Sequence, residues 1–289
     1  MRPMKGIILA AGKGTRLYPM TRPVCKPLLP IYDKPMIYYP LAVLLQAGIR
    51  EILIITPPGG ERAAFEKLLG DGSALGVSII YAVQPVARGI ADALLIGEGF
   101  LQGDDVCLVL GDNLFFSPNF PQQLAQARRN GSGATIFGYK VEDPRSFGVV
   151  EFDAQGNVLS LEEKPKQPKS DYIVPGLYFY DAQAIEIAKN LKPSARGELE
   201  ITDVNIAYME RGALKVVLLD DDFVWLDAGT ADSLVDASCT IRRIQHETGR
   251  YVACIEEISC EMGFISPEKK RAAGEEMRTT AYGKYLLSE

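Results

Sequence analysis

The chain has 289 residues, of which 47% are apolar, so it can bury a substantial core and is typical of a globular protein rather than a disordered one. Its net charge of −6 and pI near 5.1 exclude a general electrostatic attraction to nucleic acid or to an anionic membrane. Its five cysteines contain no C-x-x-C pair, which favours reduced thiols over a disulfide scaffold. The apolar run after Lys5 is too short to span a membrane, and we expect a cytoplasmic location.

In the N-terminal half, short segments rich in Ile, Leu and Val alternate with stretches of helical periodicity. This alternation predicts an α/β fold with a Rossmann-like, mixed but mainly parallel sheet flanked by helices. The expected strands are 5–10, 51–56, 78–83, 105–110 and 134–140. Helices are expected near 40–47, 61–69, 89–96 and 119–129. Pro40 suits a first helical turn, and Gly48 suits a C-terminal cap.

The middle of the chain changes character. Two strand-like runs within 148–163 surround the turn residues at 155–157 and predict an inserted antiparallel hairpin. Further strand is expected in 173–180 and 215–227, and the pattern after Thr230 is helical to the end. No linker rich in Pro, Gly or Ser precedes this helical part. We therefore expect residues 231–289 to be a helical C-terminal extension packed on a core formed by residues 1–230.

The first expected strand runs directly into a glycine-rich loop, AAGKGTRL, at 10–17. Such a loop can turn sharply and point backbone N–H groups at a phosphate, although an ordinary strand-to-helix turn has the same composition. The loop lacks the Lys-Ser/Thr pair of a P-loop, and Leu17 replaces the third glycine of a dinucleotide fingerprint, which disfavours an oxidoreductase. Arg16 and Lys26 add cations that favour a triphosphate site.

Two aspartates close apolar segments that we expect to be strands. Asp112 follows the run at 106–110, and Asp227 ends the segment 223–227. Ligands bind at the carboxyl edge of α/β sheets, and Mg²⁺ commonly takes one or two protein carboxylates together with substrate phosphates and water. Both aspartates are therefore candidate metal ligands. The alternatives are a Gly-Asp-Asn turn at Asp112 and a helix N-cap at Asp227. The charged residues at 162–164 form a charged strand end, for which a solvated surface is the favoured interpretation on physical grounds alone.

Several segments taken together resemble the glucose-1-phosphate thymidylyltransferases, a branch of the sugar nucleotidyltransferase superfamily. They are 6–40, LLGDGS at 68–73, LGDN at 110–113, EEKP at 162–165, RGELEITDVN at 196–205 and WLDAGT at 225–230. The resemblance implies a Mg²⁺-dependent enzyme that condenses dTTP with glucose-1-phosphate. The products would be dTDP-glucose, a precursor for polysaccharide biosynthesis, and pyrophosphate. It also implies a homotetramer.

Matched residue by residue, the resemblance implies three sets of contacts. The nucleotide would be held by Leu9, Gly12, Gly14, Thr15, Arg16, Lys26, Gln84, Gly89 and Asp112, with Gln84 and Gly89 facing the pyrimidine. The sugar phosphate would be held by Gly148, Glu163, Lys164, Val174, Gly176 and Arg196. Mg²⁺ would be held by Asp112 and Asp227, and catalysis would fall to Arg16, Lys26, Lys164 and Asp112.

A sugar-1-phosphate oxygen is already largely anionic near pH 7, because the second phosphate pKa is about 6. The nucleophile therefore needs no general base, and we expect the single histidine, His246, to be structural or exposed. Pro27, Phe147 and Pro175 stand where Gln, Tyr and Thr are common in the family. These departures leave open an enzyme that uses UTP or another sugar. A non-catalytic regulatory subunit is a further alternative, but it would be expected to have lost one of the metal aspartates or phosphate lysines.

Overall fold

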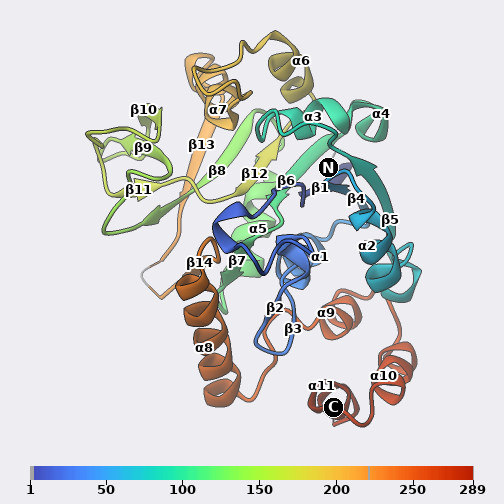
Figure 1. Ribbon diagram of the computed structural model, residues 1–289. Coiled ribbons are helices and arrows are strands. Elements are labelled where there is room, and N and C mark those ends of the chain that lie inside the picture. Colours follow the sequence, from blue (N-terminus) through green and yellow to red (C-terminus); the bar gives the residue numbers. More distant parts are fainter. Residues whose placement is uncertain (1–2, 221, 289) are drawn as a thin grey trace.

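The computed structural model describes residues 3–220 and 222–288 of the chain. In this part, one ten-stranded sheet forms the framework, with two small two-stranded sheets beside it (Figure 1). The strands are β1 (Met4–Leu9), β2 (Pro30–Ile31), β3 (Lys34–Pro35), β4 (Glu51–Thr56), β5 (Ser78–Val83), β6 (Asp105–Leu110), β7 (Asn113–Phe116), β8 (Ala134–Lys140), β9 (Gly148–Phe152), β10 (Val158–Glu163), β11 (Tyr172–Ile173), β12 (Leu177–Tyr180), β13 (Leu214–Leu218) and β14 (Val224–Asp227). The large sheet has the order β10-β9-β11-β8-β12-β6-β1-β4-β5, and β13 pairs with β8.

The predicted fold class is confirmed. Strands β6, β1, β4 and β5 pair in parallel, and they are the near-continuous apolar runs that the sequence marks as buried strands. Strand β12 pairs antiparallel with both β6 and β8, which makes the sheet mixed. The predicted hairpin is β9 and β10, and it lies at the far edge of the sheet.

Helices cover both faces of the sheet. They are α1 (Tyr38–Gln46), α2 (Glu61–Leu69), α3 (Asp92–Ile96), α4 (Glu98–Leu101), α5 (Phe120–Arg129), α6 (Gln183–Asn190), α7 (Ile201–Glu210), α8 (Ala231–Thr248), α9 (Ile255–Glu261), α10 (Pro267–Glu276) and α11 (Ala281–Leu287). Because side chains alternate along a strand, Ile8 of β1 belongs to the apolar cluster that includes residues of α1, α2 and α5. Ile7 belongs to the cluster that includes residues of α3, α6 and α7. Each face therefore has its own apolar core.

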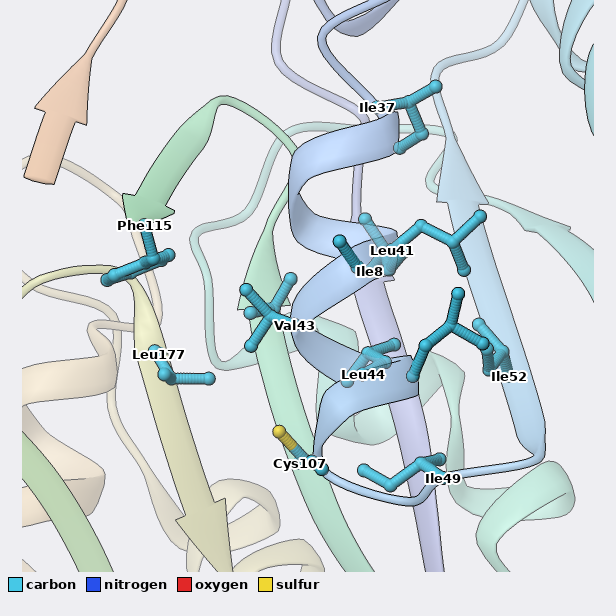
Figure 2. Packing of buried hydrophobic residues seen from close by; sticks show 14 of the residues in the cluster. Ile8, Ile37, Leu41, Val43, Leu44, Ile49, Ile52, Cys107, Phe115 and Leu177 are labelled. Atoms are coloured by element: carbon cyan, nitrogen blue, oxygen red, sulfur yellow. The ribbon is translucent and has the colours of Figure 1, made fainter. Parts of the chain in front are cut away.

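Helix α1 shows how the sequence forms the apolar core on one face of the sheet. Figure 2 shows Leu41 and Leu44 of α1 over Ile8 of β1 and Ile52 of β4, and all four side chains are fully buried. Pro40 lies in the first turn of the helix, where the missing N–H costs no hydrogen bond. Gly48 follows the last turn with φ of 75°, a conformation that favours glycine, and the chain enters β4 shortly afterwards.

The helices after Thr230 pack on the N-terminal half of the chain. Thr230 forms a capping box with Ser233 at the start of α8. Helix α8 buries Ile241 against Ile31 of the β2–β3 hairpin and Tyr39 of α1, and α9 joins the main core beside α1. Among the described residues, no helix is long and apolar enough to cross a membrane. The division of the chain at residue 230 stays a prediction.

The further strand expected in 173–180 and 215–227 is present, but each of these segments contains two separate strands. The segment 173–180 divides into β11 and β12, because the backbone leaves the strand ladder at Pro175 and the N–H of Gly176 donates to the side chain of Asn113. The segment 215–227 divides into β13 and β14, and its residue 221 lies outside the described residues. Strand β14 instead pairs with β7, a strand that the sequence patterns did not indicate.

Helix α5 supports a test of the core on the α1 face. Phe120 is 1% exposed, and its ring contacts Phe115, Phe137 and Phe223 at centroid distances of 4.9 to 6.4 Å. We expect Phe120→Ala to lower the free energy of unfolding by about 3–5 kcal/mol, because it removes transfer energy and leaves a cavity. Urea denaturation followed by circular dichroism measures this loss.

The matched control is Leu159→Ala on β10, where the side chain is 55% exposed. We expect it to change stability by less than about 0.5 kcal/mol. Equal losses in the two variants would contradict this account of the core.

Candidate active site

The loops that follow the parallel strands meet at one edge of the sheet. Strand β1 leads into the glycine loop, β5 into Gln84 and β6 into Asp112. Because β1, β4, β5 and β6 run in the same direction, all of their carboxyl ends lie along this edge. It is the position at which open α/β sheets bind ligands.

A buried lysine lies between the two predicted metal aspartates. Lys26 is 5% exposed, and its Nζ lies 2.7 Å from Asp112 Oδ2 and 3.6 Å from Asp227 Oδ1. The two aspartates come from distant parts of the sequence. They are brought together because β7 and β14 pair antiparallel with Asn113 opposite Asp227. We call Lys26, Asp112 and Asp227 the charge cluster.

The charge cluster carries more negative than positive charge. Burial raises the pKa of Asp227 above its ordinary value and the charge of Asp112 raises it further, while Lys26 and Arg16 act in the opposite direction. A divalent cation between the carboxylates would relieve this repulsion, and carboxylate oxygens are ligands that Mg²⁺ prefers. The residues present therefore fit such an ion. In the described part of the chain, no group of three or more His, Cys, Asp or Glu could hold a metal, so phosphates and water would have to complete the coordination.

Asn113 is a framework residue that sequence reasoning missed. Its Nδ2 donates to Asp112 Oδ1 at 3.0 Å, while its Oδ1 accepts from Trp225 Nε1 at 2.8 Å and from the N–H of Gly176 at 3.0 Å. One buried amide thus fixes the carboxylate of Asp112 and ties it to β14 and to the start of β12. The Gly-Asp-Asn turn is present at this position, and it leaves the Asp112 carboxylate available as a candidate metal ligand.

Arg16 approaches the charge cluster from the glycine loop. The loop bends at Gly14, which has φ of 59° and whose carbonyl accepts from Thr21 Oγ1 at 2.7 Å. A Cβ added at Gly229 would lie 3.0 Å from Arg16 Nη2 and 3.2 Å from Asp227 Oδ2, so the guanidinium and the carboxylate both flank this glycine. Glycine at 229 leaves room for both charged groups. Asp227 is not the N-cap of α8, because Thr230 fills that role.

Two adjoining cavities contain most of the predicted site. The first is lined by Leu9, Ala10, Gly12, Lys26, Pro27, Ile90, Leu110 and Asp112. The second is lined in part by Arg16, Ile90, Leu110, Asp112, Gly148, Glu163, Lys164, Val174, Pro175, Gly176, Thr202, Trp225 and Asp227. Ile90, Leu110 and Asp112 line both, so the expected nucleotide residues and the expected sugar-phosphate residues meet at Asp112. Thr15 follows Gly14 in the glycine loop and is exposed.

Glu163 and Lys164 stand at the end of β10 in the second cavity. Glu163 Oε2 accepts from Thr202 Oγ1 at 2.6 Å, and Glu163 Oε1 lies 3.2 Å from Arg196 Nη2. Lys164 has φ of 46°, and its N–H donates to the carbonyl of Phe147. This left-handed backbone turns the chain away from the strand, and the lysine side chain remains half exposed. A half-exposed cation thus stands 3.6 Å from a carboxylate that is held in place by Thr202 and Arg196.

Thr202 lies inside the motif at 196–205, but no local pattern marks it as a residue of the site. Its oxygen position follows only from the packing of α7 against β10. Arg196 lies outside both cavity linings, and its guanidinium pairs with Glu163, Glu198 and Glu200. The predicted phosphate contact of Arg196 would need N–H groups of its guanidinium, and these carboxylates already pair with them.

Gln84 and Gly89 lie on the other side of the glycine loop. Gln84 is 5% exposed, and its Nε2 donates to Asp92 Oδ2 at 2.9 Å and to the Gly89 carbonyl at 3.4 Å. Gly89 has φ of 101°, and a Cβ there would come within 2.4 Å of the Leu199 carbonyl oxygen. Only glycine fits this approach. Asp92, which sequence reasoning did not select, is fully buried at the start of α3.

Three further residues noted in the sequence, Phe147, Pro27 and His246, make few polar contacts. Phe147 packs edge-to-face on Trp225 at 5.3 Å between ring centroids, and Pro27 is buried beside Lys26 in a short 3-10 helix. His246 is exposed on α8, with Nε2 3.4 Å from the hydroxyl of Tyr32. It is in neither cavity lining, as expected for a residue without a role in the chemistry.

Comparisons with known proteins agree with this geometry. The family described as nucleotidyl transferase matches residues 5–244. A glucose-1-phosphate thymidylyltransferase of Neisseria gonorrhoeae is 55% identical over 284 residues, covering 98% of each chain. Another, from Mycobacterium tuberculosis, is 51% identical over 284 residues with the same coverage.

Solved structures give the same fold. A proposed glucose-1-phosphate thymidylyltransferase from Bacillus anthracis, in complex with sucrose, has a TM-score of 0.76 at 43% identity and covers 83% of this chain and 95% of its own. A UDP-glucose pyrophosphorylase complexed with UDP-glucose has a TM-score of 0.73 at 23% identity, with 84% and 100% coverage. At that identity the second structure supports the fold alone.

The chain therefore belongs to the nucleotidyl transferase family. The similarity to glucose-1-phosphate thymidylyltransferases extends over nearly its whole length. The chain is thus a sugar-1-phosphate nucleotidyltransferase of that group, and the resemblance drawn from the motifs is confirmed. The oxidoreductase alternative is excluded.

The negative charge of Asp227 is unfavourable for stability, and this allows a test that separates stability from activity. The pKa of the Asp227 carboxyl is raised on folding, so the folded protein favours the protonated form of this group. When the pH exceeds the pKa of the same group in the unfolded chain, its ionisation therefore lowers the stability of the fold. At pH 7 we expect Asp227→Asn to unfold at the same temperature as the wild type or higher, because Lys26 keeps Asp112 as a partner. We expect its turnover to fall about 100-fold or more.

Differential scanning calorimetry and a pyrophosphate-release assay measure the two quantities. The matched control is Asp181→Asn, at a buried aspartate that accepts from the hydroxyl of Tyr208 and lies at the opposite edge of the sheet. It should lose stability and keep turnover. An Asp227→Asn enzyme that is less stable but fully active would contradict the assignment.

Proposed function

We propose that this enzyme condenses dTTP with glucose-1-phosphate to give dTDP-glucose and pyrophosphate. The observation that carries the proposal is the charge cluster at the junction of the two cavities, with Asp112 in the lining of both. This arrangement suits two phosphate groups that must meet at one point. The activities of the relatives support the choice of substrates.

In the proposed reaction, an oxygen of the sugar phosphate attacks the α-phosphorus of the nucleotide. A new P–O bond forms as the bond from the α-phosphorus to the bridging oxygen breaks, and pyrophosphate leaves with its electron pair. The attacking oxygen is already anionic, so no residue has to remove a proton. The protein's contribution is to align two polyanions and to stabilise the charge that develops between them.

The residues divide this work by position. Lys26 is buried between its two carboxylates, so its charge is poorly screened by water and is effective toward the α-phosphate. Arg16, on the exposed glycine loop, can close over the β- and γ-phosphates, and the backbone at Gly12 and Gly14 can donate to them. On the opposite side, Lys164 grips the sugar phosphate and Glu163 accepts sugar hydroxyls. Gly148, Val174 and Gly176 line the sugar pocket.

We also propose that Asp112 and Asp227 hold Mg²⁺ together with the nucleotide phosphates. The support is the excess of negative charge at the cluster and the oxygen-only donor set. Neutralising charge on the triphosphate is the chemistry that Mg²⁺ supplies when bound. A cytoplasmic location, a homotetramer and a catalytic core ending near residue 230 remain predictions of the sequence.

A substrate panel tests the proposed reaction. Each of dTTP, UTP, dCTP and dATP is combined with glucose-1-phosphate, glucosamine-1-phosphate and galactose-1-phosphate in the presence of Mg²⁺, and pyrophosphate release is measured. We expect dTTP with glucose-1-phosphate to have the highest kcat/KM. A different best pair would show that Pro27, Phe147 and Pro175 have changed the substrate choice, and no release with any pair would favour a regulatory subunit.

Lys164→Ala tests the assignment of the second cavity. Because Lys164 lies beside Glu163 and away from Lys26, we expect the KM for glucose-1-phosphate to rise about tenfold or more while dTTP binding is unchanged. Initial-rate kinetics and isothermal titration with dTTP separate the two effects. Lys166→Ala, two residues further on, is the matched surface control. An equal loss of affinity for both substrates would contradict the assignment.

A further inference from the structure

We propose that Asp92, supported by Arg88, is a positioning residue that fixes the orientation of the Gln84 side-chain amide. By this means it selects nucleobases that carry a hydrogen on ring nitrogen N3, such as thymine and uracil, and rejects cytosine. The inference rests on the proposed function, since it requires that a nucleoside triphosphate bind at this edge of the sheet.

The place of the base follows from the arrangement of the edge. The sugar-phosphate cavity lies on the β12 side of β6, so the nucleoside must extend the other way, past β1 and β4 toward β5. Three strand spacings separate β6 from β5, roughly 14 Å. Gln84 directly follows β5, and its partner Gly89 precedes Ile90, which lines both cavities. The side-chain amide of Gln84 therefore lies at the place expected for the nucleobase of the bound nucleotide.

The orientation of that amide is determined by its partners. Asp92 is 0% exposed and forms an ion pair with Arg88, whose Nη2 lies 2.7 Å from Asp92 Oδ1. An ionised carboxylate can only accept hydrogen bonds, and so can the Gly89 carbonyl. These two acceptors take the two N–H groups of Gln84 at 2.9 and 3.4 Å. The amide thus points its nitrogen at Asp92 and leaves its carbonyl oxygen for a ligand.

This fixed oxygen discriminates between pyrimidines. Thymine and uracil present an N3–H, which can donate to it, whereas cytosine presents a lone pair at N3 and would place two acceptors against each other. A ligand that leaves a buried polar group of the site unpaired is rejected strongly. A ligand that only lacks a methylene group is rejected much less. If the amide could turn over, its N–H would instead match cytosine. Asp92 prevents this, because turning would set the amide oxygen against its carboxylate.

Asp92→Asn removes the constraint with little change in shape, because an asparagine side chain can either donate to Gln84 or accept from it. We expect the ratio of kcat/KM for dTTP to that for dCTP to fall about tenfold or more, mostly through the nucleotide KM. The KM for glucose-1-phosphate should not change. If Asp92 had a purely structural role, the substitution would lower kcat/KM for dTTP and for dCTP by the same factor, and their ratio would not change.

Asp181→Asn is the matched control, because Asp181 is also buried and hydrogen-bonded but lies at the opposite edge of the sheet. Its ratio should equal that of the wild type. Arg88→Ala is the second variant in case Asp92→Asn does not fold, since the Arg88 side chain is 58% exposed. It weakens the hold on Asp92, and we expect a smaller fall in the ratio, about threefold.

The outcomes separate this inference from the proposed function. A wild-type enzyme that prefers dTTP, with Asp92→Asn and Arg88→Ala variants that keep the same ratio, would overturn the role of Asp92 alone. If the wild type releases no pyrophosphate with any sugar phosphate, the proposed function fails. Isothermal titration with dTTP and dCTP then tests the orientation, and equal preference in wild type and Asp92→Asn would overturn it.

Discussion

The ion pairs of Lys26 with Asp112 and Asp227 are the interaction on which the rest of the site depends. A buried ammonium group is expensive to desolvate unless it is paired, so the two aspartates stabilise the buried lysine at the sheet edge. In return, the lysine allows two carboxylates to lie close together in a partly buried place. The remaining negative charge is what a divalent ion can use. Arg16 and Lys164 are more exposed than Lys26, and both line the second cavity, where each would be free to approach a phosphate.

The principal task of the fold is to position the groups of the site. The parallel strands bring the glycine loop, Gln84 and Asp112 to one edge, and the β7–β14 pairing adds Asp227. Asn113 and Asp92 then fix the groups that would touch substrates, one by holding a carboxylate and the other by holding an amide. Neither residue needs to contact a substrate. Such buried hydrogen bonds are effective because few alternative arrangements exist for a polar group away from water.

Much of the fold could be predicted because its signals are local. The apolar runs of β4, β5, β6 and β8 have the bounds expected from the sequence, because short runs rich in Ile, Leu and Val between turn residues favour strands whatever the direction of their partners. The division at Pro175 and the pairing of β14 with β7 depend on partners distant in the chain, which no local pattern encodes. The same holds for Thr202 and Asp92, whose roles follow from the elements they face. The motifs located Asp112, Asp227, Lys26 and Lys164, but their mutual distances required the structure.

Metal binding by the charge cluster is the most direct test of the central claim. Titration of Mn²⁺, a spectroscopic substitute for Mg²⁺, is followed by electron paramagnetic resonance in the presence of dTTP and without sugar phosphate. The account predicts that the wild type and Asp181→Asn bind the ion with equal affinity, and that Asp112→Asn binds it at least about tenfold more weakly. Undiminished Mn²⁺ affinity in Asp112→Asn, with dTTP bound, would contradict the claim that this cluster is the phosphoryl-transfer centre.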